Sequence, residues 1–167
     1  MSTSKKAFSS AGRQTSLFPL LAQMIHIEQI RPELTWRLRR EALYPAGEIA
    51  DMAMDTDSQG IHFGAFTDNK LVGVVSVFQH GDILQFRKFA VDQAYQNMGV
   101  GTALLNYTIE FATENGGIRL WCNARLNAVG FYFKNGFAQT GLLFSKNGYD
   151  YAILEKSLVL KKPASLT

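Results

Sequence analysis

The chain has 167 residues, of which 47% are hydrophobic and 19% are charged, so it can bury the core of one domain and is not a disordered chain. Its formal net charge is +3, but residues 41–160 hold 8 basic and 12 acidic side chains, so the excess of lysine and arginine lies toward the two ends. This distribution argues against a basic groove for nucleic acid.

The number of cysteines, the positions of the histidines and the length of the apolar segments exclude further classes of protein. Cys122 is the single cysteine, so an internal disulfide framework is excluded and we expect a reducing, cytoplasmic setting. His26, His62 and His80 are too scattered for a zinc site, and we expect no metal. No run of about 18 apolar residues is present, so we expect no membrane-spanning helix and no membrane partner.

Three segments are expected along the chain. Residues 1–23 contain no acidic residue, are rich in serine and threonine, and are interpreted as an N-terminal tail or extension. Residues 24–160 form a single domain, because no linker long enough to divide them is present, and residues 161–167 form a C-terminal tail.

The first part of the domain is expected to begin with a strand over residues 24–29, where apolar and polar residues alternate. Pro32 then opens a helix that ends before Pro45, since proline is tolerated in the first helical turn. Residues 47–59 have weak apolar spacing, which favours a helical turn or a lid over a core element.

The later elements alternate between strands and helices. Residues 62–66 and 71–78 are expected to form a hairpin, followed by a strand over 83–91 and a helix over 99–115 that stops at two glycines. Strands are also expected over 118–124, 138–143 and 149–158, and a short helix over 128–135. This order predicts a mixed α/β fold with a mostly antiparallel central sheet of about seven strands and helices on both faces.

A glycine-containing loop connects the strand over 83–91 to the following helix, and it reads Gln-Asn-Met-Gly-Val-Gly-Thr over residues 96–102. Glycine allows a sharp turn and a close approach to the backbone, while the first helical turn offers unpaired N–H donors. The loop therefore suits a pyrophosphate, although a plain glycine turn is the alternative. Leu104 stands where a Rossmann fingerprint needs its third glycine, and no P-loop motif is present.

A second segment, RLWCNARLNAVGFYFKNGF over residues 119–137, places a tyrosine on a short helix directly after a strand. With the loop, it resembles the GNAT superfamily of acyl-CoA-dependent N-acetyltransferases, whose patterns are Q/R-x-x-G-x-G/A and A-x-x-F/L-Y-x-x-x-G-F. The matching residues are Gln96, Gly99 and Gly101 for the first pattern, and Ala128, Phe131, Tyr132, Gly136 and Phe137 for the second. The resemblance covers residues 24–158. Residues 38–45, 61–66, 84–87 and 121–125 resemble one bacterial subgroup of small, mostly uncharacterised GNAT proteins.

The resemblance implies a GNAT-like fold and transfer of the acetyl group of acetyl-CoA to a primary amine by direct attack on the thioester. The implied partner is an acceptor amine, either a small molecule or a peptide. We expect no nucleic-acid partner, and whether the protein forms a homodimer is left open. The alternative function is a non-catalytic acyl-CoA-binding or interaction module on the same fold, because the strand over residues 83–91 carries no carboxylate to act as a base.

The resemblance also implies roles for individual residues. Tyr132 is the expected general acid, with a packed core aromatic as the alternative. A bulge in the strand before the loop would free backbone N–H groups for the thioester oxygen and the pantetheine arm. The expected cofactor contacts are Phe89, Ala90, Val91, Gln96, Asn97, Met98, Gly99, Val100, Gly101, Thr102, Asn127 and Phe131.

Several residues keep two interpretations. Cys122 is expected to be a buried hydrophobe rather than a nucleophile. Asn127 suits either the pantetheine arm or a helix cap, Arg87 either the acceptor cleft or an edge salt bridge, and Arg125 either fixing a loop or binding an acidic substrate group.

The general base is left open. Its candidates, none of them preferred, are Glu41, Asp51, His62 and His80, acting directly or through water. No base is needed if the amine arrives neutral. The acidic residues within 41–57 suggest that the acceptor is cationic.

Overall fold

Seven strands form one sheet in the computed structural model, which describes residues 24–158. The tails expected over residues 1–23 and 161–167 lie outside the described residues, as do residues 159–160 of the expected domain. The predicted mixed α/β fold with a mostly antiparallel sheet is confirmed.

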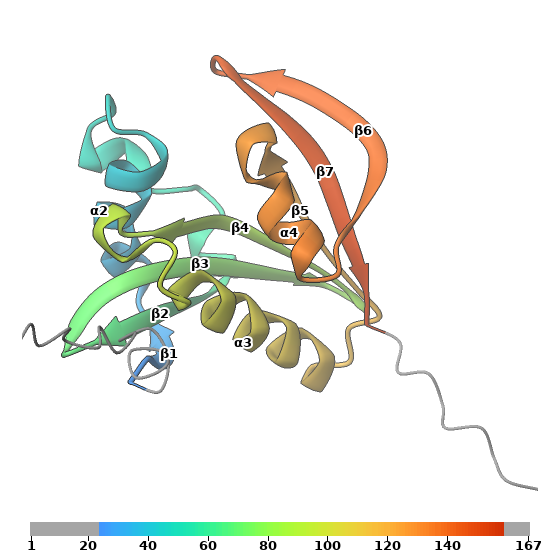
Figure 1. The fold of residues 1–167 in the computed structure, drawn as a ribbon, viewed down its shortest axis with the longest axis horizontal. Helices are drawn as coiled ribbons and strands as arrows, with labels where there is room; N and C mark the ends of the chain where they lie inside the picture. The colour runs from blue at the N-terminus through green and yellow to red at the C-terminus, as the bar shows by residue number, and fades with distance from the viewer. Residues whose placement is uncertain (1–23, 159–167) are drawn as a thin grey trace, which may run out of the picture.

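The sheet has the order β1-β2-β3-β4-β5-β7-β6, and only β4 and β5 are parallel neighbours. The strands are β1 (His26–Ile30), β2 (Ile61–Thr67), β3 (Lys70–His80), β4 (Ile83–Val91), β5 (Arg119–Arg125), β6 (Ala138–Lys146) and β7 (Tyr149–Ser157). The two halves, β1–β4 and β5–β7–β6, meet at one end and diverge toward the other (Figure 1).

Helical segments cover both faces of the sheet (Figure 1). On one face, α3 (Val100–Glu114) contacts β2, β3 and β4, and α4 (Val129–Lys134) adds Tyr132 to the same buried cluster. On the other face, Leu38 from α2 (Trp36–Leu38) packs with residues of β3 and β4 in a smaller cluster. Successive strand residues point to opposite faces, so one strand serves both clusters.

The segment before β2 departs from the single helix that was expected. It comprises a 3-10 turn, η1 (Pro32–Thr35), then α2, then a π turn, η2 (Arg39–Leu43). The π turn closes because the N–H of Tyr44 donates to the carbonyls of both Arg39 and Arg40. Residues 47–59 form two further 3-10 turns, η3 (Ile49–Met52) and η4 (Asp57–Gln59).

The divergence of β4 from β5 creates the opening that contains the site. The two strands pair only from Ile83 to Gln85, and beyond this point the β5-facing edge of β4 has no strand partner within the described chain. Near the opening, Lys88 and Phe89 of β4 lie opposite the single residue Val75 of β3, which is a β-bulge. Lys88 has a φ of 55°, so the bulge places a non-glycine residue in the left-handed region.

Candidate active site

The glycine-containing loop forms a cradle of backbone donors at the start of α3. Gly99 is the N-cap of this helix and has a φ of 87°, a conformation that favours glycine. The Nε2 of Gln96 donates to the carbonyl of Val91 at 3.2 Å, which ties the loop to the end of β4. Within residues 24–158, the backbone N–H groups of 97–102 donate to no backbone or side-chain acceptor. The positive end of a 15-residue helix therefore presents free donors, as an anion site requires.

Phe131 of α4 packs against this cradle. A Cβ added at Gly101 would lie 3.4 Å from the ring of Phe131, an ordinary van der Waals distance, so the first turn of α3 lies directly beside α4. The ring of Phe131 is also 5.8 Å from that of Phe89, centroid to centroid. These contacts bring together the loop, the bulged strand and the tyrosine-bearing helix.

The bulged end of β4 offers further backbone donors, and strand alternation decides which. The N–H of Asp92 donates to the carbonyl of Val72 on β3 at 2.8 Å. Alternation then directs the N–H of Ala90, which pairs with Val74, toward β3 as well. The N–H of Val91 faces the side that β5 leaves open. Phe89, Ala90 and Val91 were expected to offer free backbone N–H groups to the cofactor. For Ala90 this expectation is wrong, because its N–H is directed toward β3 within the sheet.

A cleft of about 430 Å³ lies where β4 and β5 separate. Its walls come from the end of η2, from β4, from the region of β5 through α4, and from the hairpin of β6 and β7. Among the expected site residues, those that line it are Phe89, Gln96, Asn127 and Tyr132. Asn127 makes no side-chain cap to η6 (Leu126–Ala128) or α4, so its alternative role as a helix cap is not seen.

Tyr132 and Cys122 face the cleft from buried positions. Tyr132 is 6% exposed and packs among Phe86, Phe131 and Phe137. Burial raises the pKa of Tyr132 well above its usual value, and the adjacent Cys122 adds to this, so the hydroxyl keeps its proton at neutral pH. Burial also raises the pKa of Cys122 to about 12. The thiol is therefore protonated and buried, as expected for a small hydrophobe rather than a nucleophile.

Basic side chains gather on the side of the cleft formed by the end of η2 and the hairpin of β6 and β7. Lys88 donates from Nζ to the hydroxyl of Tyr44 at 2.6 Å and lies 4.4 Å from its ring centroid. The guanidinium of Arg125 lies 3.7 Å from the ring centroid of Tyr149 and donates from Nη2 to the carbonyl of Leu43. Burial, together with the charge of Arg87, lowers the pKa of Lys88 to about 8.

The candidate bases do not line this cleft. His62 is buried, with Nδ1 2.7 Å from the hydroxyl of Ser76 and Nε2 2.8 Å from the carbonyl of Asp57. Glu41 forms an exposed ion pair with Arg37 at 2.8 Å. His80 ends β3 at an exposed position, and Asp51 lines only an adjoining pocket.

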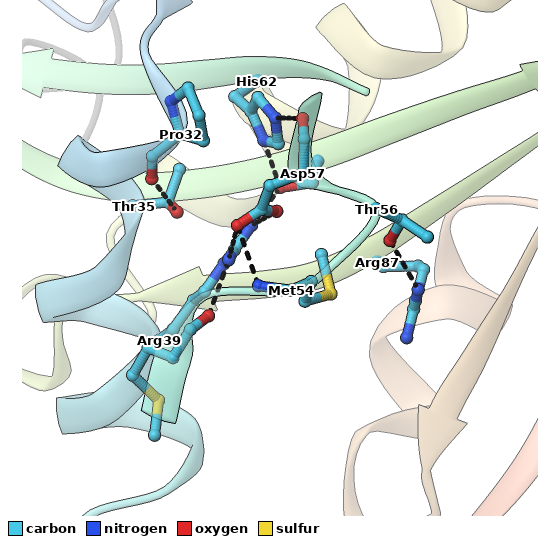
Figure 2. Close-up of polar contacts among 10 residues, drawn as sticks. Pro32, Thr35, Arg39, Met54, Thr56, Asp57, His62 and Arg87 are labelled. Atoms are coloured by element: carbon cyan, nitrogen blue, oxygen red, sulfur yellow. Dashed lines mark hydrogen bonds and ion pairs between the residues drawn. The ribbon is translucent and has the colours of Figure 1, made fainter. Parts of the chain in front are cut away.

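The expectation of a cationic acceptor rests on the acidic side chains within residues 41–57. None of them lines this cleft, although Asp51 lines the adjoining pocket together with Tyr44 and Lys88. Asp57 is held in a buried ion pair with Arg39, beside β2 and β3 (Figure 2). The guanidinium donates to both carboxylate oxygens, at 2.9 and 2.8 Å, and to the Ser76 hydroxyl and the Met52 carbonyl. This network fixes the 3-10 turns beside the cleft. Figure 2 also shows Arg87 directed at the hydroxyl of Thr56, 3.4 Å away.

Comparison with known proteins identifies the family. The model of the acetyltransferase (GNAT) family matches residues 22–137, well over half of the chain. The chain belongs to the GNAT acetyltransferase family. It is therefore an acetyltransferase, and the motif resemblance is confirmed. Residues 24–158 contain no cluster of His, Cys, Asp and Glu side chains arranged to hold a metal ion, and no helix there is long and apolar enough to cross a membrane.

Similar proteins are found both by sequence and by structure. An uncharacterized N-acetyltransferase of Bacillus subtilis, YitI, is 26% identical over 145 residues, which covers 81% of this chain and 97% of that protein. The ribosomal-protein-S18-alanine N-acetyltransferase of Escherichia coli has a TM-score of 0.70 at 19% identity, covering 86% of this chain and 99% of the other. A GNAT family acetyltransferase from Elizabethkingia anophelis, solved with acetyl-CoA bound, has a TM-score of 0.65 at 21% identity. The match covers 80% of this chain and 98% of that protein.

Sequence reasoning missed Tyr44, Lys88 and Lys146 among the residues that line the cleft. The turn of Lys88 toward Tyr44 depends on the bulge, which shifts the alternation of β4. Lys146 lies beyond the predicted end of its strand at residue 143, since β6 continues to Lys146. Tyr44, Lys88 and Lys146 lie in three separate segments of the sequence, so no local pattern could have grouped them.

Proposed function

We propose that this GNAT acetyltransferase uses acetyl-CoA as its donor and transfers the acetyl group directly to an amine that enters the cleft between β4 and β5. The observation that carries the proposal is the set of free N–H donors over residues 97–102, next to a cleft into which Tyr132 faces. Neighbouring GNAT structures include one solved with acetyl-CoA, which supports the choice of donor.

The residues present fit this donor. The free N–H groups of 97–102 and the helix dipole suit a pyrophosphate, whereas the open edge of β4 suits the amides of a pantetheine arm. The N–H of Val91 would bind the thioester oxygen or a pantetheine carbonyl. Acetyl-CoA supplies the activated acyl group; the protein orients it and stabilises charge on the carbonyl oxygen.

Proton transfer is assigned to Tyr132. Its hydroxyl keeps its proton at neutral pH, and it lines the cleft, so it can donate a proton to the departing sulfur. The acceptor nitrogen loses a proton as the amide forms, and this proton passes to solvent or restores the tyrosine hydroxyl. Cys122 is protonated up to about pH 12, so direct attack by the acceptor amine is favoured over relay through this thiol. The acceptor must arrive as a neutral amine, because no carboxylate or histidine is among the described residues that line the cleft.

Coenzyme A binding tests the cradle. At about 100 times its Kd, coenzyme A should stabilise the protein by roughly 2.7 kcal/mol in thermal unfolding. Gly99→Ala should weaken this effect, because Gly99 has a φ of 87° at the N-cap of α3. Gly81→Ala is the matched control: Gly81 also has a positive φ, 63°, but lies in the turn between β3 and β4. Absence of stabilisation, or an equal loss in both variants, would contradict the proposed site.

The variant Tyr132→Phe tests whether Tyr132 is the general acid. The variant should bind coenzyme A as the wild type does, while kcat falls by roughly 10² to 10⁴ if Tyr132 supplies the proton. Release of coenzyme A from acetyl-CoA, followed with a thiol reagent and a reactive amine, measures kcat. Unchanged kcat across the pH range would remove Tyr132 from this role, leaving it as a packed aromatic.

A further inference from the structure

The acceptor side of the cleft carries four positive side chains, and the nearby Asp51 lies in the adjoining pocket, which shares Lys88 with the cleft. Arg87 and Lys88 come from β4, Arg125 from the end of β5, and Lys146 from the end of β6, and all four line the cleft. No aspartate or glutamate is among the described residues lining it, and none of the four forms an ion pair within residues 24–158. Like charges gathered without an acid destabilise a fold, so such a cluster points to a bound anion.

These groups are positioned with donors to spare. Arg125 is held by the ring of Tyr149 and by one bond to the Leu43 carbonyl, so most of its five N–H groups are uncommitted. Lys88 uses one donor on the hydroxyl of Tyr44. A guanidinium fixed against an aromatic ring loses little entropy when it binds a second group, which makes Arg125 a suitable anchor for a planar carboxylate or for a phosphate.

The cluster is set apart from the cradle expected to hold the phosphates of the donor. Of residues 96–102, only Gln96 lines the cleft that contains the basic side chains. The walls nearest the basic groups come instead from the end of η2 and from the hairpin of β6 and β7, which supply Leu43, Tyr44 and Asn147. The positive charge therefore faces the space left for the acceptor.

We propose that the acceptor of this enzyme is an amine that also carries an anionic oxygen group, a carboxylate or a phosphate, which binds Arg87, Lys88, Arg125 and Lys146. This inference rests on the proposed acetyl transfer, and it names the substrate class of that same site. The arrangement also bears on the absent base. Positive charges near the acceptor disfavour its ammonium form and so favour the neutral amine that attacks the thioester.

The test compares acceptors that differ only in the anionic group. Initial rates of coenzyme A release are measured with amino acids against their amides, with phosphoethanolamine against ethanolamine, and with spermidine. We expect kcat/KM for the anionic member of a pair to exceed that of the neutral member by about tenfold or more, the usual effect of a charge-assisted hydrogen bond. The amino acid and phosphate arms distinguish the two anionic groups. Preference for the amides, ethanolamine or spermidine would overturn the proposal.

Variants locate the effect. Arg87→Gln and Lys146→Gln should each raise the KM of the anionic acceptor by about fivefold or more and leave the KM of acetyl-CoA unchanged. Lys146 is exposed, so its replacement should not disturb folding. Arg119→Gln is the matched control, because Arg119 begins β5, at the end opposite Arg125, and pairs with Glu155. A raised KM for acetyl-CoA in the first two variants would assign the cations to the donor phosphates and refute the proposal.

Binding without turnover separates this inference from the proposed function. Calorimetric titration of the free protein with an amino acid and with its amide measures the anion preference whether or not any amine reacts. Stronger binding of the amino acid supports the anionic site even if coenzyme A fails to stabilise the protein, which would contradict the acetyl-CoA site alone. Equal binding of the two refutes the anionic site, even where acetyl transfer to other amines is observed.

Discussion

Asp57→Asn should destabilise the fold strongly, because it removes one partner of a buried ion pair. The side chains of Arg39 and Asp57 are 0% and 9% exposed, and the guanidinium makes two bonds to the carboxylate, at 2.8 and 2.9 Å. Asparagine leaves the guanidinium charge buried without a counter-charge, and one of its two bonds then meets an amide nitrogen. Breaking such a pair costs about 3–5 kcal/mol, a large part of the roughly 5–15 kcal/mol that stabilises a domain.

A second ion pair of the same length provides the control. Arg37 and Glu41 are also 2.8 Å apart, but their side chains are 42% and 45% exposed, so Glu41→Gln should cost only about 0–1 kcal/mol. Urea unfolding followed by circular dichroism measures the free energy of unfolding of both variants. In thermal unfolding, the Tm of Asp57→Asn should fall by roughly 10 °C. Equal and small losses in the two variants would refute the argument that burial decides the contribution of these pairs.

Three further predictions concern stability and pH. Burial raises the pKa of Asp57, but the bonds from Arg39 and from the Met54 N–H, with the Arg39 charge, outweigh it and hold the pKa below its usual value. The free energy of unfolding, measured in urea, should therefore fall as the pH drops below about 4, and it should fall less in Asp57→Asn. Gly117→Ala should destabilise by about 1–3 kcal/mol in thermal unfolding, because its Cβ would lie 2.7 Å from the backbone carbonyl oxygen of the helix before it, and a fully stable variant would contradict this. Binding of a carboxylate analogue without an amine should weaken above about pH 8, where Lys88 loses its proton; calorimetry should show no such change in Lys88→Met.

The sequence predicted those elements whose patterns depend on local rules. The strand expected over residues 83–91 is β4, Ile83–Val91, and the helix expected over 99–115 is α3, Val100–Glu114. Alternation and helical spacing set the interiors, while Gly99 and the glycines after the helix set its ends. The glycine loop at this strand-to-helix junction follows from the same signals, whereas the roles expected of its individual residues come from the GNAT resemblance.

The parts that the sequence did not predict depend on contacts between distant segments. The expected helix after Pro32 becomes η1, α2 and η2, in which Arg39 is buried to reach Asp57, 18 residues later. Its helical spacing is satisfied by more than one kind of turn, so tertiary contacts decide between them. The GNAT resemblance implied a bulge in this strand, but its position at Lys88 leaves no signature in the sequence, because it depends on the register with β3.

The net charge of residues 41–160 is negative, whereas the charged side chains that line the cleft are positive. The charge of the cleft lining is the one that bears on the acceptor class. Residues 41–160 carry four more acidic than basic side chains, which by itself suggests a cationic acceptor. The structure places Asp57 in a buried pair and Glu41 on the surface, while basic residues from β4, β5 and β6 meet where β4 and β5 diverge. Electrostatic interaction falls off with distance and is screened beyond about 10 Å, so an acceptor responds to the lining of the cleft rather than to the sum over the domain.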